Sequence, residues 1–298
     1  MSVTVRVPAK VNVQLAVGAA RPDGFHDLAN VFLAVGLYDE ITVTPADALR
    51  VTCEGPDAHQ VPLDESNLAA RAALALAGRY GRRADVHLHI AKDIPVAGGM
   101  AGGSADGAGA LLACDALWGT GASREELLEI CAELGSDVPF SLVGGAALGV
   151  GRGERLTVLE VGGTFHWVFA MAGRGLSTPA VFREFDRLTE GLDVPEPVAS
   201  PELLRALAKG DPDALAAAVS NDLQPAALSL FPELAGTLAA GRDAGALAAL
   251  VSGSGPTTAF LARDPGSAEK IADALRASGT CRTVRTAQAP TEGATIVR

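Results

Sequence analysis

The stretch from Ile94 to Cys114 reads IPVAGGMAGGSADGAGALLAC and contains six glycines and a single charged residue, Asp106. Glycine has no Cβ and adopts positive φ angles readily, so a loop rich in glycine lets backbone N–H groups approach a ligand closely. The alanine- and leucine-rich run that follows predicts a helix, whose free N–H groups and dipole favour an anion at its start. The stretch therefore predicts a phosphate-binding loop. A glycine-rich connection packed tightly against a sheet is the alternative that composition leaves open.

Two common nucleotide-binding patterns are absent from the sequence. A Walker A loop needs Gly-Lys followed by Ser or Thr, and the dipeptide Gly-Lys does not occur in the chain. The G-x-G-x-x-G spacing of dinucleotide-binding folds is also missing. Ser104 lies where the loop passes into the helix, so its hydroxyl could cap the helix, bind a phosphate oxygen or ligate magnesium.

Length and composition bound the class of protein. The 298 residues predict about two domains of ~150 residues each. A hydrophobic content of 48% and a charged content of 20% are typical of a soluble globular protein. The formal charge of −11 argues against binding of nucleic acid or anionic membranes, because both need a positive field.

The cysteines and the N-terminus predict a cytoplasmic protein. The four cysteines lie too far apart for a C-x-x-C or zinc pattern, which favours free thiols in a reducing compartment. The N-terminal segment MSVTVRVPAK has no apolar signal-peptide core, and no run is long and apolar enough to span a membrane.

The pattern along the chain mixes strands and helices without regular βαβ alternation, which predicts an α+β fold. Strands are expected at residues 3–7, 11–15, 31–35, 40–44, 86–90, 146–150, 155–161, 167–171 and 283–287, and after the glycine turn up to residue 262. Helices are expected at residues 67–80, from the glycine loop to 118, at 124–134, from 136, within 201–249 and at 267–277. A change of composition near Gly162 divides the chain into an N-terminal domain, residues 1–162, and a C-terminal domain, residues 163–298.

Details of these elements concern the site. Alternation places Lys10 and Asn12 on one face of their strand, about 7 Å apart. Asp64 or Ser66 is expected to cap the first helix, and SREE at Ser123 to Glu126 forms a capping box. The Pro-Asp-Gly of RPDGFHD predicts a turn before the second long segment.

Three segments in this order resemble the motifs of the GHMP small-molecule kinases: PAKVN at 8–12, PVAGGMAGGSADGAGAL at 95–111, and SGSGPT at 252–257. RPDGFHDL and GSDVPF, at 21–28 and 135–140, resemble the 4-diphosphocytidyl-2-C-methyl-D-erythritol kinases within that superfamily. The resemblance implies a ribosomal-S5-like N-terminal domain and an α+β C-terminal domain, with the active-site cleft between them. It also implies ATP-dependent phosphorylation of the 2-hydroxyl of a cytidine-diphosphate-linked methylerythritol, in the non-mevalonate route to isoprenoid precursors.

By the resemblance, Asp137 and Lys10 are the catalytic pair. The family's catalytic aspartate stands where Asp137 stands, and a carboxylate there can accept the proton of the attacking hydroxyl. Lys10 would stabilise developing negative charge and keep Asp137 ionised. The plain alternatives are that Asp137 caps the helix at DVPF and that Lys10 is a solvent-facing strand residue. The chain has only four lysines, and two fall in motif positions, Lys10 and Lys92, which favours the functional interpretation of Lys10. Whether Asp137 removes the proton early or chiefly positions the hydroxyl is left open.

The resemblance also implies the substrate-binding residues. The ring of Phe25 would stack on the cytosine, a contact worth roughly 1–3 kcal/mol, and the imidazole of His26 would bond its polar edge. The family usually has tyrosine at the position of Phe25, so a hydrogen bond from that hydroxyl is lost here. Asn12 and Thr178 complete the predicted substrate contacts, together with Asp137. For GFH alone, a turn with a half-buried ring is the simpler interpretation.

The predicted ATP site is the glycine loop with two outlying residues, Asn67 and Lys92. The loop residues are Pro95, Val96, Ala97, Gly98, Gly99, Met100, Ala101, Gly102, Gly103, Ser104 and Ala105. Magnesium is expected to arrive with ATP, since no metal-ligand cluster is visible in the sequence. His87 and His89 alternate with core residues of a strand and receive no metal role.

Two other functions compete with this interpretation. Another kinase of the superfamily, acting on mevalonate, homoserine or a sugar, is disfavoured by RPDGFH, because those substrates carry no base. A non-enzymatic RNA-binding protein with the S5-like fold is disfavoured by the charge of −11. The expected partners are therefore ATP and the cytidine-linked substrate, with no nucleic acid and no membrane. The chain is expected to be a monomer or a weak homodimer.

Overall fold

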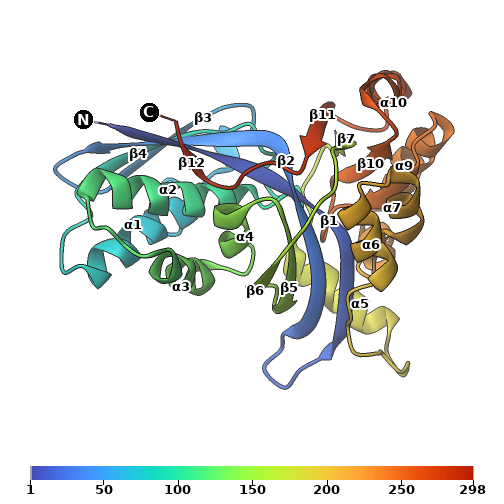
Figure 1. Cartoon of the computed structure of the whole chain (residues 1–298), viewed down its shortest axis with the longest axis horizontal. Coiled ribbons are helices and arrows are strands. Elements are labelled where there is room, and N and C mark those ends of the chain that lie inside the picture. The colour runs from blue at the N-terminus through green and yellow to red at the C-terminus, as the bar shows by residue number, and fades with distance from the viewer. Residues whose placement is uncertain (1, 298) are drawn as a thin grey trace.

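Two long antiparallel strands, β1 (Val3–Ala20) and β2 (His26–Pro45), form the framework of the structure, a computed structural model that describes residues 2–297. In Figure 1 they run together across the molecule and bend towards the tight connection at their lower end. Both strands are rich in valine, alanine and leucine, and most of their residues are buried. This pair therefore carries residues from one end of the molecule to the other.

The first sheet grows outward from this pair and has eight strands among the described residues. One end of β2 pairs with β4 and its other end with β5. The remaining members are β3, β5, β6, β8 and β12 (Arg50–Glu54, Ala146–Gly151, Arg155–Leu159, Ser220–Asn221 and Thr295–Ile296), and β4 is Val86–Ala91.

Four helices cover one side of this sheet, α1 (Leu68–Arg79), α2 (Gly102–Trp118), α3 (Arg124–Leu134) and α4 (Val138–Val143) (Figure 1). The helix α2 lies against β1 and β2, and its small residues allow the close approach. At Gly109 an added Cβ would lie 2.6 Å from the Cδ1 of Ile41 and 2.7 Å from the Cγ2 of Val7, so those core side chains would have to move. The glycine and alanine content of α2 thus serves both the loop and the packing behind it.

The second sheet has the order β11-β7-β10-β9 and is antiparallel throughout. Its strands are Thr283–Ala289, Phe165–Met171, Thr258–Ala262 and Ala248–Val251, in the same order. Its helices are α5 to α10 (Thr178–Leu188, Pro201–Lys209, Pro212–Ala218, Gln224–Leu230, Leu234–Asp243 and Pro265–Ser278). A short 3-10 helix, η1 (Ala58–Gln60), lies in the loop after β3.

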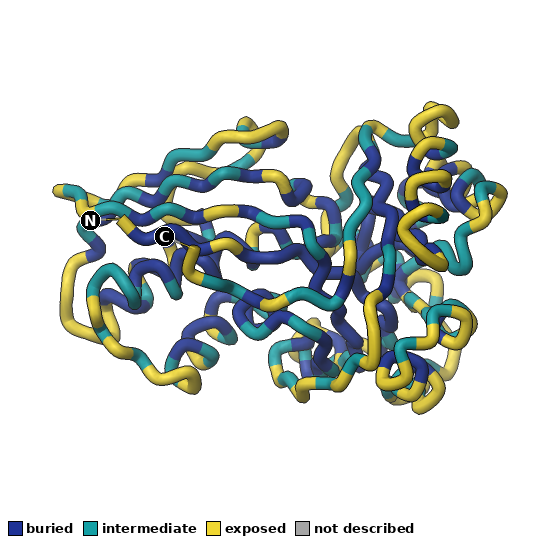
Figure 2. The backbone as a smooth tube through the Cα atoms, turned by 45° about the horizontal axis from the view of Figure 1, so that its top comes forward, coloured by how far each residue is buried: buried dark blue, intermediate teal, exposed yellow. Residues whose placement is uncertain are grey.

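Burial follows these two layers. Figure 2 shows buried backbone along the sheets and the inner helix faces, with exposed residues at loops and outer helix turns. The largest fully buried side chains include Trp167, Phe169 and Phe260 of the second sheet, Phe32 of the first sheet, and Phe140 of helix α4, which stacks on Phe32. The predicted α+β class and two-part architecture are confirmed.

Most predicted elements are present, and three of the expectations differ from the structure. The strands expected at residues 3–7 and 11–15 are one strand, because Pro8 is accommodated at a bulge between Pro8 and Ala9. The segments 31–35 and 40–44 are likewise parts of β2. The prediction that Asp64 or Ser66 caps α1 was wrong, since the cap is Asn67, whose Oδ1 accepts a bond from the N–H of Ala69.

One further prediction about a helix start is confirmed, and several elements were not predicted. The capping box of Ser123 and Glu126 is confirmed, and both of its hydrogen bonds are present. Helix α5 and strands β3, β8, β9 and β12 were not predicted, and β9 begins inside the segment that was expected to be helical. Across residues 2–297 there is no helix of the length and apolarity needed to cross a membrane.

The two sheets share segments of chain, although each has its own core. The proposed boundary between residues 162 and 163 lies just before β7, the first strand of the second sheet. After β11 the chain returns to the first sheet, where β12 pairs with β1, and both termini lie close together in Figure 1. The boundary therefore remains a proposal. It assigns β12 to the C-terminal domain, although β12 pairs with β1 in the first sheet.

Candidate active site

A cavity of about 640 Å³ lies where the two parts meet, and the segments singled out in the sequence converge on it. It takes residues from β1 and β2, from the glycine loop, from α5 and from the glycine turn before β10. The residues predicted to bind substrate or act in catalysis that line it are Lys10, Asn12, Phe25, His26, Asp137 and Thr178. Segments that lie more than two hundred residues apart in the sequence thus line the same cavity.

Lys10 is a buried cation of the cavity, and two hydrogen bonds hold its ammonium in place. Its side chain is buried, and its Nζ donates to Asn12 Oδ1 at 2.6 Å and to the carbonyl oxygen of Gly99 at 2.8 Å. Burial lowers the pKa of Lys10, and the nearby carboxylate of Asp137 opposes that shift. The Lys10 ammonium therefore joins strand β1 to the glycine loop and still faces the cavity.

Asp137 stands at the start of α4 but does not cap it. Its Oδ2 lies 3.7 Å from the Nζ of Lys10, an ion pair that is longer than a hydrogen bond. Its side chain remains 30% exposed and makes no bond to the first turn of α4. The carboxylate is therefore free to accept a proton from a ligand.

The glycine loop has the backbone conformation expected of an anion cradle. Ala97, Gly99 and Ala101 all have positive φ, at 51°, 74° and 60°. Ala101 is the N-cap residue of α2, and no acidic residue lies in the first turn of that helix. The N–H groups at the start of α2 have no partner within the helix and lie beside the cavity, so the loop can receive phosphate oxygens.

The glycine turn of the second part closes against this loop. Ser252 Oγ donates to the carbonyl oxygen of Gly99 at 3.1 Å, and a Cβ on Gly99 would lie only 2.2 Å from the Ser252 carbonyl oxygen. A Cβ on Gly253 would lie 3.1 Å from Lys10 Nζ. Because glycine stands at both positions, the two loops meet directly around the ammonium of Lys10.

The far end of the cavity carries an aromatic ring on a tight turn. Gly24 has a φ of 80°, and the side chain of Asp23 accepts from the N–H of Phe25 at 3.0 Å, which shapes the turn. The ring of Phe25 is 50% exposed, and the guanidinium of Arg152 lies 5.2 Å from its centroid. An exposed ring held by a cation is available for stacking with a flat ligand.

His26 lies next to that ring but is buried. Its Nε2 lies 2.8 Å from Asp186 Oδ1, and its ring centroid lies 5.0 Å from that of Phe182 and 5.9 Å from that of Phe185. Those three partners all come from α5. Thr178, at the start of the same helix, bonds Ser254 through its hydroxyl at 2.8 Å.

Several predicted ATP-binding residues do not line the cavity. Met100 and Ala105 are buried in the core, and Val96 lies outside the lining. Asn67 is occupied as the cap of α1 and donates to the carbonyl oxygen of Pro62 at 2.7 Å. The remaining loop residues line the cavity: Pro95, Ala97, Gly98, Gly99, Ala101, Gly102, Gly103 and Ser104.

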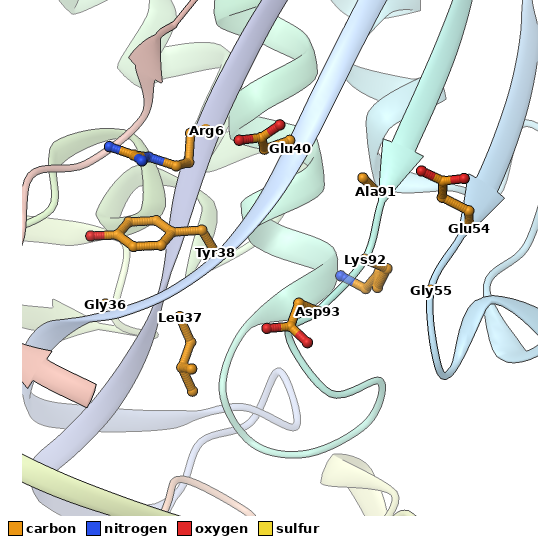
Figure 3. A pocket seen from close by; sticks show the side chains of 10 residues that line it. All are labelled: Arg6, Gly36, Leu37, Tyr38, Glu40, Glu54, Gly55, Ala91, Lys92 and Asp93. Atoms are coloured by element: carbon orange, nitrogen blue, oxygen red, sulfur yellow. The ribbon is translucent and has the colours of Figure 1, made fainter. Parts of the chain in front are cut away.

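Lys92 also lies away from the cavity. Its ammonium is buried between the carboxylates of Asp39 and Asp106, with Asp106 Oδ2 at 3.0 Å. Lys92 borders a second cavity of about 550 Å³ over the sheet, shown with Tyr38 and Asp93 in Figure 3, which contains no residue of the glycine loop. The side chain thus supports the start of α2 from behind, since an added Cβ on Gly102 would lie 2.9 Å from Lys92 Nζ.

Six polar or aromatic residues of the cavity were missed by the sequence analysis. They are Asn30, Ser136, Arg152, Phe182, Arg183 and Asp186. Three belong to α5, which begins with Ser-Thr-Pro and has Val181 and Phe185 on its buried face. The start signal and the four-residue spacing could have predicted this helix. Asn30, which accepts from Asn12 Nδ2 at 2.7 Å, carries no local signal.

Comparison with known proteins agrees with this geometry. The sequence model of the GHMP kinases N terminal domain matches residues 67–145, and that of the GHMP kinases C terminal matches residues 203–281. The 4-diphosphocytidyl-2-C-methyl-D-erythritol kinase of Streptomyces coelicolor is 84% identical over all of both chains. The enzyme of that name from Thermobifida fusca is 60% identical, covering 99% of this chain and 98% of the relative.

Solved structures show the same fold. A crystal structure of 4-(cytidine 5'-diphospho)-2C-methyl-D-erythritol kinase has a TM-score of 0.79 at 33% identity, covering 96% of this chain and 99% of the other. A homoserine kinase from Cytophaga hutchinsonii has a TM-score of 0.75 at 20% identity, with 99% and 97% covered, and shares the fold. The chain therefore belongs to the GHMP kinases and, within them, to the 4-diphosphocytidyl-2-C-methyl-D-erythritol kinases.

Proposed function

We propose that this ATP-dependent small-molecule kinase phosphorylates the 2-hydroxyl of 4-diphosphocytidyl-2-C-methyl-D-erythritol, in the non-mevalonate route to isoprenoid precursors. The names of its relatives support this substrate. The observation that carries the proposal is the single cavity that joins the Lys10–Asp137 pair, the glycine loop and the ring of Phe25. A substrate with a base at one end and a hydroxyl at the other fits that order of groups.

Asp137 is the proposed proton acceptor. As the hydroxyl oxygen bonds to the γ-phosphorus, the bond from that phosphorus to the bridging oxygen of ADP breaks, and the hydroxyl proton passes to Asp137. Its exposed carboxylate and its lack of a capping bond leave both oxygens available for this role.

Lys10 is the proposed electrostatic partner. Its ammonium is fixed by Asn12 and by the Gly99 carbonyl, so it needs no rearrangement to face the negative charge that develops on the transferred group. It also favours the ionised form of Asp137 before the transfer begins.

The loop fits the phosphates of ATP by its backbone. Positive φ at Ala97, Gly99 and Ala101 and the free N–H groups at the start of α2 form a concave donor surface. We propose that Mg²⁺ enters with ATP, where it would neutralise phosphate charge. Ser104, where the loop enters α2, and Asp137 are two oxygen-bearing side chains of the cavity that could contact it.

The direct test is ADP release with purified protein and one acceptor at a time. We expect turnover with the cytidine-linked methylerythritol and none above background with mevalonate or homoserine. Turnover with mevalonate or homoserine, and none with the cytidine-linked acceptor, would assign the site to another substrate of the superfamily.

We further propose that the chain acts as a monomer or weak homodimer without nucleic-acid partners, in keeping with its charge of −11. Light scattering after size exclusion, with and without added RNA, measures both points.

A further inference from the structure

His26 has one defined ring orientation in the cavity. The side chain is 4% exposed, and the rings of Phe182 and Phe185 pack on it at interplanar angles of 32° and 81°. His26 is also the first residue of β2 and pairs with Ala20 of β1, which fixes its backbone. The imidazole therefore cannot turn freely to suit a ligand.

Asp186 determines which ring nitrogen carries the proton. Its Oδ1 lies 2.8 Å from His26 Nε2, and a carboxylate can only accept a hydrogen bond. A neutral imidazole has one donor and one acceptor, so the nitrogen that faces Asp186 is the donor and Nδ1 is the acceptor. Within residues 2–297 no group bonds to Nδ1, which leaves this acceptor for a ligand in the cavity.

Pyrimidine bases differ at the atom that such an acceptor would contact. Cytosine carries an exocyclic amino group, a donor, where a uracil-type base carries a carbonyl oxygen, an acceptor. We propose that Asp186 is a positioning residue that selects cytosine over uracil, because it holds His26 in the tautomer whose Nδ1 accepts from the cytosine amino group. This inference rests on the proposed function, since that function supplies a cytidine-diphosphate ligand.

The position of Asp186 makes the inference testable without unfolding the protein. Its side chain is 41% exposed at the cavity, and among the described residues that side chain bonds only to His26. Substitutions there remove the tautomer constraint and leave the buried face of α5, with Val181 and Phe185, intact.

The first experiment measures the affinities of cytidine diphosphate, uridine diphosphate and ADP by calorimetric titration. The wild-type protein should bind cytidine diphosphate at least tenfold more tightly than uridine diphosphate. Asp186→Ala should lower the affinity for cytidine diphosphate roughly ten- to a hundredfold, because the buried His26 loses its hydrogen-bond partner, and should leave the affinity for ADP unchanged. Asp186→Asn should also raise uridine diphosphate affinity, because the new amide can donate to Nε2 and turn Nδ1 into a donor.

The matched control is Glu190→Gln, which removes one exposed carboxylate just after the same helix and leaves the cavity untouched. It should retain the wild-type ratio of the two pyrimidine nucleotides. A second measurement, ¹⁵N NMR of the His26 ring, should show a proton on Nε2 in wild type and a changed tautomer in Asp186→Asn.

A double-mutant cycle shows whether Asp186 acts through His26. In a His26→Phe background, Asp186→Ala should leave the ratio of the two affinities unchanged. An equal loss of cytidine diphosphate affinity in both backgrounds would overturn the inference, as would a wild-type His26 protonated on both nitrogens.

The outcomes also separate this inference from the proposed function. A wild-type protein that binds ADP but neither pyrimidine nucleotide contradicts the proposed substrate itself. A protein that phosphorylates the cytidine-linked acceptor yet binds both pyrimidine nucleotides equally retains its function and contradicts the role of Asp186.

Discussion

At the scale of single residues, the site depends on a carboxylate and an ammonium that are 127 positions apart in sequence and 3.7 Å apart in space. Asp137→Asn should keep the shape of the side chain and remove the proton acceptor. We expect turnover to fall roughly 10²–10⁴-fold, with the thermal midpoint unchanged because Asp137 makes no capping bond. ADP release and a thermal melt measure the two effects, and near-normal turnover would exclude Asp137 as the proton acceptor.

The charge of Lys10 should limit activity at high pH. Burial lowers its pKa below the ordinary value of 10.5. The ammonium is the useful form, so kcat/KM should fall as the pH rises through this lowered pKa. In Lys10→Arg the charge persists, so the alkaline fall should disappear while the overall rate drops, since a guanidinium does not reproduce the compact ammonium. An alkaline fall that persists in Lys10→Arg would assign it to another group.

The sequence drew attention to Lys10 and Asp137 through short motifs that resemble those of the family, and the structure brings the two side chains together. Their catalytic roles stay predictions. The sequence placed Lys10 and Asn12 on one face, as the 2.6 Å bond between them requires. It could not predict Asn30, Arg152 or Asp186, because their function arises only where distant elements meet. The family resemblance also placed Lys92 at ATP, and nothing in the local sequence indicates that the side chains of Asp39 and Asp106 bury it.

At the scale of elements, the glycine loop is held by close contact with its neighbours. Gly99→Ala would place a Cβ 2.2 Å from the Ser252 carbonyl oxygen at a φ of 74°. We expect ADP binding to be lost, because the loop must move away from the second part. Gly119→Ala, also at positive φ but with open space around it, is the matched control and should cost only about 1 kcal/mol of stability. If Gly99→Ala and Gly119→Ala weaken ADP binding equally, the cause is backbone strain at positive φ and not the contact between Gly99 and Ser252.

The charged cluster behind α2 should make stability depend on pH. Burial raises the pKa of Asp106 well above its usual range, against the attraction of Lys92. The folded state then keeps a proton that the unfolded chain releases near pH ~4, so this contribution to stability is lost as the pH rises through the raised pKa. Asp106→Asn keeps the neutral form, and its free energy of unfolding relative to wild type should increase as the pH rises from about 4 to 8.

Urea denaturation at several pH values measures this difference. Asp273→Asn, at an exposed carboxylate paired with Arg276, is the control and should show no such trend. If the free energies of unfolding of wild type and Asp106→Asn change by the same amount across this pH range, Asp106 is ionised in the folded protein throughout it.

At the scale of the whole molecule, long-range pairing joins the parts, and this was the least predictable feature. The strand β12 has only two residues, and its pairing with β1 spans nearly the whole sequence. Local pattern cannot indicate such a contact, because no periodicity develops over two residues. The same holds for β8, which joins the helical segment after residue 201 to β1.

The returning C-terminal segment should therefore stabilise the first sheet. Thr291 bonds the hydroxyl of Tyr38 at 2.7 Å, and the segment crosses Gly144 so closely that an added Cβ there would lie 2.0 Å from the backbone nitrogen of Gly293. Deleting residues 291–298 should lower the thermal midpoint by several degrees, because a strand and its backbone bonds are lost. Tyr38→Phe removes only the side-chain bond and should cost about 1 kcal/mol. Calorimetry that finds the same midpoint for the deletion and for wild type would mean that β12 rests on the first sheet without stabilising it.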